Sequence, residues 1–365
     1  MSSLVRRALV AALALITVAV ALSACGGTPL SSAPSASTPP DTAAPAIIAP
    51  TSPPIASPAP SASTEVLPGE SWIAFQASGA GGYGVYLIRE DGTGMHLWPS
   101  GIAGGYEHPD WSPDGERIMV NSIESDGTED IWIAGVDGRD PTRLVDCVAP
   151  CVWADEAAWS PDGTKVAFQR LVVDVDVFRS TLEILYVATG GVTEVLAMPG
   201  SQVVLAPRWS PDGARLVVEV IDLATPSLES DLVGGGIGVV DLTASTPAVE
   251  MLVPFETFAQ SPDWSPDGEE LIYAQPSVAD ANLLDLHGIA PDGSGERRIT
   301  ELAASGESAI QPAFAPEGDR ILFLLTRSGR QETVMALVDL DGSNLRPATA
   351  AGYQDGFHPR LRPIR

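Results

Sequence analysis

The side chains of this 365-residue sequence that could do chemistry gather at one repeated position, three residues before a Trp or its equivalent. In chain order this position holds His108, Glu156, Ala206, Ser261, Gln311 and His358. Two imidazoles and a carboxylate, from His108, His358 and Glu156, are the donors of an open transition-metal site with room for water or substrate. The repeat position indicates that these side chains face the same axis but not how far apart they lie. The alternative is that they stay apart and each only caps local backbone. We therefore expect no metal and no cofactor, with these three residues as the ligands if they converge.

Residues around the same position predict a ligand-binding mouth. An acidic and aromatic lining of this kind suits a cationic or sugar-like ligand. The predicted mouth consists of Tyr106, Glu107, His108, Trp153, Asp155, Glu156, Gln260, Gln311, Phe357 and His358.

The first 25 residues have the layout of an export signal. Two arginines precede an apolar run of 15 residues that ends at Leu22, which is too short for a membrane-spanning helix. The sequence Leu-Ser-Ala-Cys that follows resembles a bacterial lipoprotein signal, and this implies lipidation of Cys25 after removal of residues 1–24. The alternatives are an ordinary signal peptide with a chance Cys, or an uncleaved anchor. We expect an exported protein on the outer face of the cytoplasmic membrane, or in the periplasm or outer membrane if the organism has one.

A low-complexity segment follows the signal. Residues 25–68 are almost wholly Ser, Thr, Pro, Ala and Gly, so they carry too little apolar area to offset the entropy of ordering. We expect a disordered tether there, with a folded domain over residues 69–365.

The two remaining cysteines, Cys147 and Cys151, stand on either side of Pro150. In an oxidising compartment such a pair predicts a disulfide. A metal site is the alternative, although two thiolates supply only half of the ligands that zinc needs.

The folded domain is one repeat. Trp-Ser-Pro-Asp-Gly begins at Trp111, Trp159, Trp209 and Trp264, and a degenerate copy begins at Phe314. Pro presets φ, Asp bonds its own backbone and Gly supplies positive φ, so each string makes a tight turn between two β-strands. Asp-Gly pairs such as Asp137-Gly138 predict the next hairpin. Each unit is then a four-stranded antiparallel sheet.

Units of about 50 residues stack radially, which is the arrangement of a propeller. Two half-repeats complete each other, because Trp72–Phe75 is a second strand without a first and Phe357–Leu361 is a first strand without a second. We therefore predict an all-β, six-bladed β-propeller that the C-terminal strand closes.

The strings resemble the repeats of the TolB-like six-bladed propellers, which also form the N-terminal domains of dipeptidyl-peptidase-like enzymes. The resemblance covers residues 69–365 and implies the fold. The TolB role does not transfer, because a tether stands where TolB has a further domain. The peptidase activity does not transfer either, because the sequence has no Gly-x-Ser-x-Gly pentapeptide.

Charge and composition limit the partners. Acidic residues number 47 against 20 basic ones, for a net charge of −27, and such a polyanion repels nucleic acid. We expect a monomeric, non-catalytic binding or scaffold module, tethered to the membrane through its lipid, for a protein, peptide or glycan. The alternative is a stand-alone propeller enzyme, a metal-dependent hydrolase or lyase with its site at the axial funnel.

Overall fold

The computed structural model describes residues 65–67, 69–79, 81–102, 104–175, 177–327, 332–348 and 353–363. The expected signal peptide, Cys25 and all but the end of the expected tether lie outside the described residues. Within them the chain is almost entirely β, with two short 3-10 helices at Phe255–Thr257 and Ala303–Ser305. Among these residues no helix is long and apolar enough to cross a membrane.

The strands pair antiparallel in consecutive sets of four. The first two sets are β4 (Gly105–Trp111), β5 (Arg117–Ile123), β6 (Glu129–Gly135) and β7 (Thr142–Val145), then β8 (Cys151–Trp159), β9 (Lys165–Asp174), β10 (Val177–Tyr186) and β11 (Gly191–Ala197). Next come β12 (Gln202–Trp209), β13 (Arg215–Leu223), β14 (Leu232–Asp241) and β15 (Val249–Val253). They are followed by β16 (Gln260–Trp264), β17 (Leu271–Pro276), β18 (Leu284–Ile289) and β19 (Arg297–Arg298), and by β20 (Glu307–Phe314), β21 (Arg320–Arg327), β22 (Glu332–Asp339) and β23 (Arg346–Pro347).

The remaining set takes strands from both ends of the chain. β1 (Trp72–Gly79), β2 (Gly82–Arg89) and β3 (His96–Leu97) are joined by β24 (Tyr353–Leu361). β24 pairs antiparallel with β1, placing Leu361 opposite Ile73 and Phe357 opposite Gln76. The predicted partnership of the two half-repeats is therefore present in the structure.

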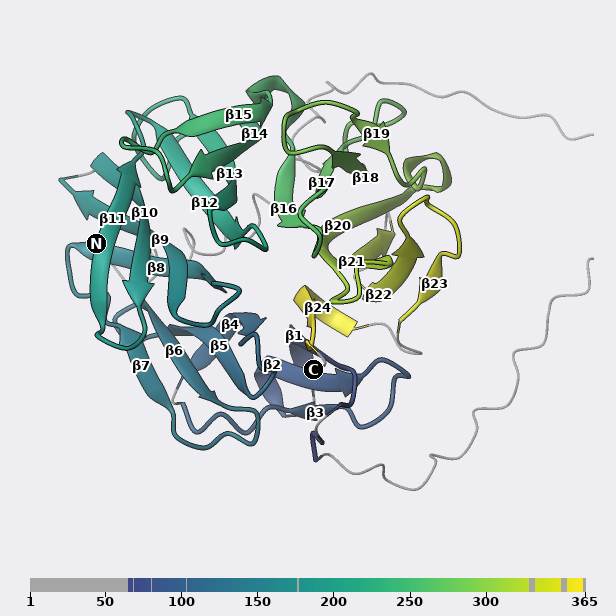
Figure 1. Ribbon diagram of the computed structural model, residues 1–365, viewed down its shortest axis with the longest axis horizontal. Helices are drawn as coiled ribbons and strands as arrows, with labels where there is room; N and C mark the ends of the chain where they lie inside the picture. Colours follow the sequence, from purple (N-terminus) through teal and green to yellow (C-terminus); the bar gives the residue numbers. More distant parts are fainter. Residues whose placement is uncertain are drawn as a thin grey trace, which may run out of the picture.

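The first strand of each set lies innermost (Figure 1). Strand β4 contacts β8, and the contacts continue through β12, β16, β20 and β24 back to β4, so the inner strands close a ring. The sheets radiate from this ring, and neighbouring sheets pack face to face.

The Ser-Pro-Asp-Gly turns form as their chemistry predicts. In the turn between β12 and β13, the amide of Gly213 donates to the carbonyl of Ser210 at 2.8 Å, and the Ser210 hydroxyl accepts from the amide of Arg215 at 2.9 Å. The Asp212 carboxylate accepts from the amide of Ala214 at 3.0 Å. Local bonds thus satisfy the backbone at the point where the chain reverses.

The Trp of each string links neighbouring sheets. The indole Nε1 of Trp209 donates to the carbonyl of Ala158 in the preceding set at 3.1 Å. Arg215 of the following strand then lies over the ring of Trp264 in the next set, 4.8 Å from its centroid. The cation–π contact also forms at Trp111, Trp159 and Trp209, whereas Trp159 and Trp264 lack the indole bond within the described part of the chain. The contact with a basic residue is therefore the feature that accompanies the repeated Trp.

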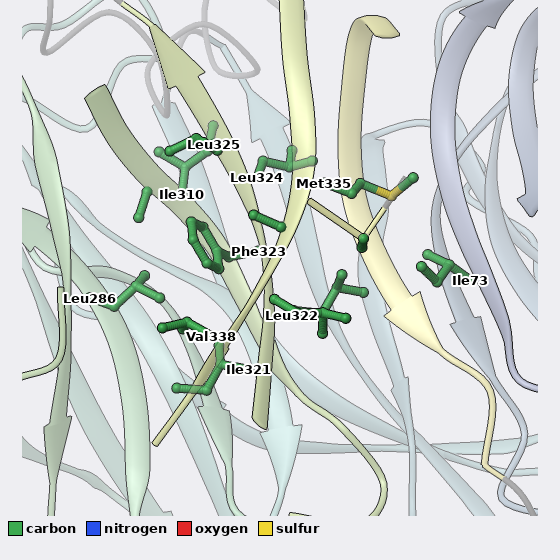
Figure 2. Close-up of a cluster of buried hydrophobic side chains, with 14 of the residues drawn as sticks. Ile73, Leu286, Ile310, Ile321, Leu322, Phe323, Leu324, Leu325, Met335 and Val338 are labelled. Atoms are coloured by element: carbon green, nitrogen blue, oxygen red, sulfur yellow. The ribbon is translucent and has the colours of Figure 1, made fainter. Parts of the chain in front are cut away.

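Apolar side chains fill the space between the sheets. The largest cluster joins the β20–β22 strands to β1, with Phe323, Leu322 and Ile73 fully buried (Figure 2). Each fully buried side chain of this size contributes roughly 1.5–3 kcal/mol. The closing sheet is therefore held by side-chain packing as well as by its hydrogen bonds.

Candidate functional site

Every inner strand carries a β-bulge at the same repeat position. The residues there have positive φ although none is Gly: His108 (49°), Glu156 (52°), Ala206 (45°), Ser261 (53°), Gln311 (52°) and His358 (51°). The ladder register shifts at each of these points. Bulges re-aim side chains and are enriched beside binding sites. This backbone feature therefore positions the repeated residues that the sequence singles out.

Side chains from neighbouring sets satisfy the backbone amides at several bulges. Glu156 Oε2 accepts from the amide of Ala206, Glu219 Oε2 accepts from that of Ser261 at 2.8 Å, and Gln311 Oε1 accepts from that of His358 at 2.8 Å. Capping of backbone, one of the two roles considered for these residues, thus applies to Glu156 and Gln311. It leaves the second oxygen of Glu156 for another partner.

Three of the repeated side chains converge. His108, Glu156 and His358 each offer one ligand atom, and these atoms all lie within 4.8 Å of one another. The rings of His108 and His358 meet edge to face with centroids 4.1 Å apart, although 250 residues separate them in sequence. Ring closure through β24 brings them together.

His108 is held by a carboxylate. Its Nδ1 lies 2.6 Å from Asp155 Oδ1, and each of the two side chains is only 16% exposed. Burial opposes the imidazolium form, but the Asp155 carboxylate outweighs it and raises the pKa of His108 to about 9. Asp155 also accepts from the amide of Glu156 at 2.6 Å, so one carboxylate orients both residues.

Acidic groups surround this histidine. Burial, and then the nearby Asp155, raise the pKa values of both Glu129 and Glu156. Burial, and then Glu156, raise the pKa of Glu219 to about 8. Carboxyl groups packed this closely oppose one another's ionisation, and a cation placed among them would favour the ionised forms.

His358 has the opposite character. Burial, and then the charge of His108, lower its pKa well below the usual value. Its Nε2 lies 2.9 Å from Gln311 Nε2, and its Nδ1 is buried without a hydrogen-bond partner among the described residues. Gln311 points its oxygen at the His358 amide, so its NH2 group faces the ring, and His358 Nε2 must accept.

The structure distributes the predicted mouth residues unequally. Tyr106 lies edge to face with Trp98, and Trp153 packs with Leu171 and Phe178, so both rings fill cores between sheets instead of lining a mouth. Burying their large apolar area is favourable, and the space between sheets accommodates it. Gln260 is also buried.

The other predicted residues lie nearer the axial group. Glu107 accepts from the hydroxyl of Tyr83 at 2.9 Å and from Gln76 at 3.3 Å. Phe357 is half-buried and lies beside His358, with ring centroids 6.4 Å apart. The lining is thus more acidic and less aromatic than the sequence predicts.

A second group of buried polar residues was missed by sequence reasoning. Each follows the apolar run of the second strand of a set: Gln76, Asn121, Gln169 and Glu219. Asn121 pairs with Glu107 and Gln169 with Asp155, directly beside the bulges. The signal was present, because one polar residue stands at the same repeat position in four units. These polar groups are concentrated on consecutive sets, since the equivalent residues of β17 and β21 are Ala274 and Leu324.

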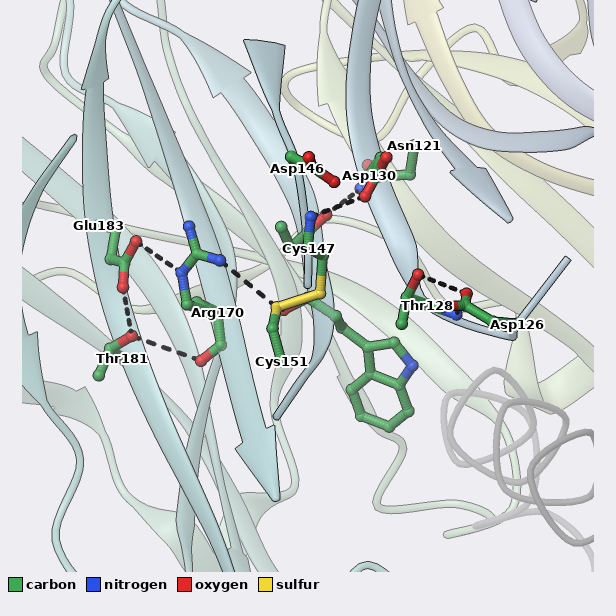
Figure 3. Close-up of a disulfide and its surroundings, with 12 residues drawn as sticks. Asn121, Asp126, Thr128, Asp130, Asp146, Cys147, Cys151, Arg170, Thr181 and Glu183 are labelled. Atoms are coloured by element: carbon green, nitrogen blue, oxygen red, sulfur yellow. Dashed lines mark hydrogen bonds and ion pairs between the residues drawn. A yellow bond between two sulfur atoms is a disulfide. The ribbon is translucent and has the colours of Figure 1, made fainter. Parts of the chain in front are cut away.

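The structure also contains a disulfide between Cys147 and Cys151, with Cα atoms 5.3 Å apart (Figure 3). The amide of Cys147 donates to Asp130 at 2.8 Å, and Arg170 reaches Cys151 Sγ at 3.4 Å while pairing with Glu183. The disulfide links the connection that follows β7 to the start of β8, the strand that carries Asp155 and Glu156.

Comparison with known proteins places the fold. No protein-family profile matches the chain. An uncharacterised protein of Agrobacterium fabrum, Atu1656, is 26% identical over 253 residues, which cover 66% of this chain and 74% of that protein. Among solved structures, a protein assigned as TolB from Agrobacterium tumefaciens matches with TM-score 0.55 and 20% identity, over 80% of this chain and 98% of its own. TolB from Acinetobacter baumannii matches with TM-score 0.58 and 17% identity, over 80% and 66%.

The β-propeller domain of the trilobed protease from Pyrococcus furiosus also matches, with TM-score 0.50 and 14% identity, over 78% of this chain and 83% of that one. Together these similarities identify a β-propeller fold similar to that of TolB. The predicted all-β architecture of four-stranded antiparallel sheets is confirmed.

Proposed function

We propose that this protein is an exported, lipid-anchored, six-bladed β-propeller that acts as a non-catalytic binding module. A signal peptide over residues 1–24, lipid on Cys25 and a tether over 25–68 would hold the propeller of residues 69–365 away from the membrane as a monomer. The similarity to TolB structures supports the propeller, and the lipoprotein-like sequence before Cys25 supports the anchor.

One observation carries the binding role: polar and acidic side chains gather on one part of the inner ring. Glu107, His108, Asp155 and Glu156 lie on adjacent sets. Burying several carboxyl groups together costs folding free energy, and groups whose pKa values are shifted by burial and by neighbouring charges are concentrated at binding and catalytic sites. The charge of the group favours a positively charged protein, peptide or glycan.

Binding is tested with site-directed crosslinking in the intact envelope, followed by affinity measurement with each partner identified. Glu107→Gln should weaken binding of a cationic partner, because it removes a charge without changing shape. Asp292→Asn, in the exposed turn after β18, is the matched control. Unchanged affinity in both Glu107→Gln and Glu156→Gln for every partner would refute this binding site.

The anchor is tested separately. Cys25→Ser should abolish labelling by a fatty-acid analogue and release or misprocess the protein. Cys147→Ser is the matched control and should label normally. If the Cys25→Ser protein stays membrane-bound and is processed as the parent is, the lipoprotein assignment is wrong.

The alternative function, a metal-dependent hydrolase or lyase at the funnel, would use the same axial residues. We favour binding because the convergence of His108, Glu156 and His358 points to an ion and does not by itself point to a substrate.

A further inference from the structure

His108, Glu156 and His358 form a donor set that a partner-binding surface does not require. They come from β4, β8 and β24, which follow one another around the inner ring. We propose that these three side chains bind one divalent transition-metal ion, for which Zn²⁺ is the probe, and leave a coordination position open to water or to an anionic ligand group. This inference is independent of the proposed function, because the isolated protein can be tested for metal.

The spacing of the donors fits an ion after a small contraction. Ligand atoms about 2.1 Å from one tetrahedral ion stand roughly 3.4 Å apart, so atoms within 4.8 Å of one another must close by up to about 1.4 Å. Side-chain rotation supplies this movement while the bulges hold the backbone. Glu156 keeps one oxygen on the amide of Ala206 and can turn the other to the ion.

The hydrogen bonds of His108 are those of a metal ligand. Its Nδ1–H donates to Asp155 at 2.6 Å, and the ion takes the place of the Nε2 proton, which is released to solvent on binding. Metal-ligating histidines almost always give their other ring nitrogen to a carboxylate, carbonyl or water. Asp155 is therefore the positioning residue of the site.

His358 is held for a different tautomer. Gln311 makes Nε2 an acceptor, so the proton of the neutral ring is on Nδ1, the buried nitrogen without a partner among the described residues. Because Nε2 points towards Gln311 in the preceding set, we assign Nδ1 as the ligand atom. Metal binding there requires the proton to move to Nε2, where it meets the amide NH2 of Gln311. Gln311 thus disfavours metal binding until its side-chain amide flips and presents its oxygen to Nε2.

The charges around the donors favour a dication. Glu107, Asp155 and Glu156 act on His108, and Glu129 belongs to the same acidic group, whereas Arg208 and Arg360 act on His358. A bound dication offsets the mutual repulsion of these carboxylates.

The experiment uses the full, tag-free processed protein, purified in detergent and stripped of metal. Calorimetry should show one equivalent of Zn²⁺, and Co²⁺ should give the d–d absorption of a nitrogen and oxygen site. Glu156→Gln retains an oxygen for the Ala206 amide and should weaken Zn²⁺ by more than the roughly 10–100-fold typical of outer-shell changes. Asp155→Asn should weaken it within that range. His358→Ala should abolish the Co²⁺ spectrum.

The other two histidines of the sequence are matched controls. His96→Ala and His287→Ala should bind Zn²⁺ as the parent does. Equal Zn²⁺ affinity in the parent and in Glu156→Gln, or no stoichiometric binding by the parent, would overturn the proposal.

Gln311→Glu tests the assignment of Nδ1. A carboxylate accepts from both the His358 amide and a protonated Nε2, so this variant should bind Zn²⁺ more tightly than the parent. Weaker binding would overturn Nδ1 as the ligand atom.

Discussion

At the scale of residues, Glu219 offers a measurable consequence of the axial charge. Its side chain is only 6% exposed, it accepts from the Ser261 amide, and burial and then Glu156 raise its pKa to about 8 from 4.5. The folded state therefore retains a proton that the unfolded chain loses. The free energy of unfolding should fall as pH rises from about 4.5 and level off above about 8, by on the order of 5 kcal/mol from this group.

Glu219→Gln removes this titration and keeps an acceptor for Ser261. Urea unfolding at several pH values should show that the variant loses less stability as pH rises. At pH 8 its free energy of unfolding should exceed that of the parent. Glu250→Gln, on the exposed side of β15, should leave the pH dependence unchanged. Parallel curves for Glu219→Gln and the parent would contradict the prediction.

Single residues also mark the limit of what the sequence reveals. Repeat register predicts that His108, Glu156 and His358 face the same axis on neighbouring units, and this arrangement is present. The distances depend on the inner radius and on the positive φ of each bulge, which no local pattern encodes. The hydrogen bonds between Gln311 and His358 likewise depend on contacts between repeats. Tyr106 and Trp153 are buried in clusters between sheets, since an aromatic residue beside a bulge can pack on a core as readily as it can line a mouth.

At the scale of elements, the turns that join the strands differ in how closely they approach a neighbour. Gly138 and Gly213 both have positive φ, at 78° and 69°. A Cβ on Gly213 meets nothing within 4 Å, whereas one on Gly138 would come to 1.7 Å from the backbone carbonyl oxygen of Pro99 in the adjoining set. The β6–β7 turn is therefore part of the contact between two sheets.

We expect Gly213→Ala to cost about 1–2 kcal/mol of unfolding free energy, the cost of a left-handed residue. Gly138→Ala should cost clearly more, because the carbonyl of Pro99 must also move. Denaturant unfolding of both variants measures the difference, and Gly213→Ala is the control for backbone strain alone. Equal losses would show that the two sheets adjust freely at this contact.

Elements were the most predictable level of this molecule. The Ser-Pro-Asp-Gly strings and the Asp-Gly pairs specify turns through local bonds, so their positions follow from sequence, as in the turn at Ser210. The sequence does not predict the bulges, because the residues at these positions, as different as Ala206 and His358, are not of one type that favours positive φ.

At the scale of the whole molecule, β24 completes the ring. Near the end of this strand, the Arg360 carbonyl accepts from the indole Nε1 of Trp111. The Arg362 side chain donates to the carbonyl of Gly115 at 2.9 Å, and its backbone amide donates to the carbonyl of Trp72 at 2.8 Å. A chain that ends at Asp355 loses these contacts and exposes the edge of β1. Such edges promote association.

The truncated protein should therefore melt at a lower temperature and associate, as calorimetry and light scattering would show. A chain that lacks only residues 364–365 keeps the pairing of Leu361 with Ile73 and is the control. An unaltered melting curve for the longer truncation would count against closure by β24.

The pairing of β1 with β24 also determines how the molecule bears mechanical load. Ile73 lies opposite Leu361 and Ser78 opposite Gln354, so the start of β1 and the end of β24 share one end of the ladder. A force that draws the two chain ends apart pulls on one hydrogen-bonded pair at a time, beginning at Ile73, and peels the strands open without shearing them. The ring is thus weakest against tension applied between the start of β1 and the end of β24.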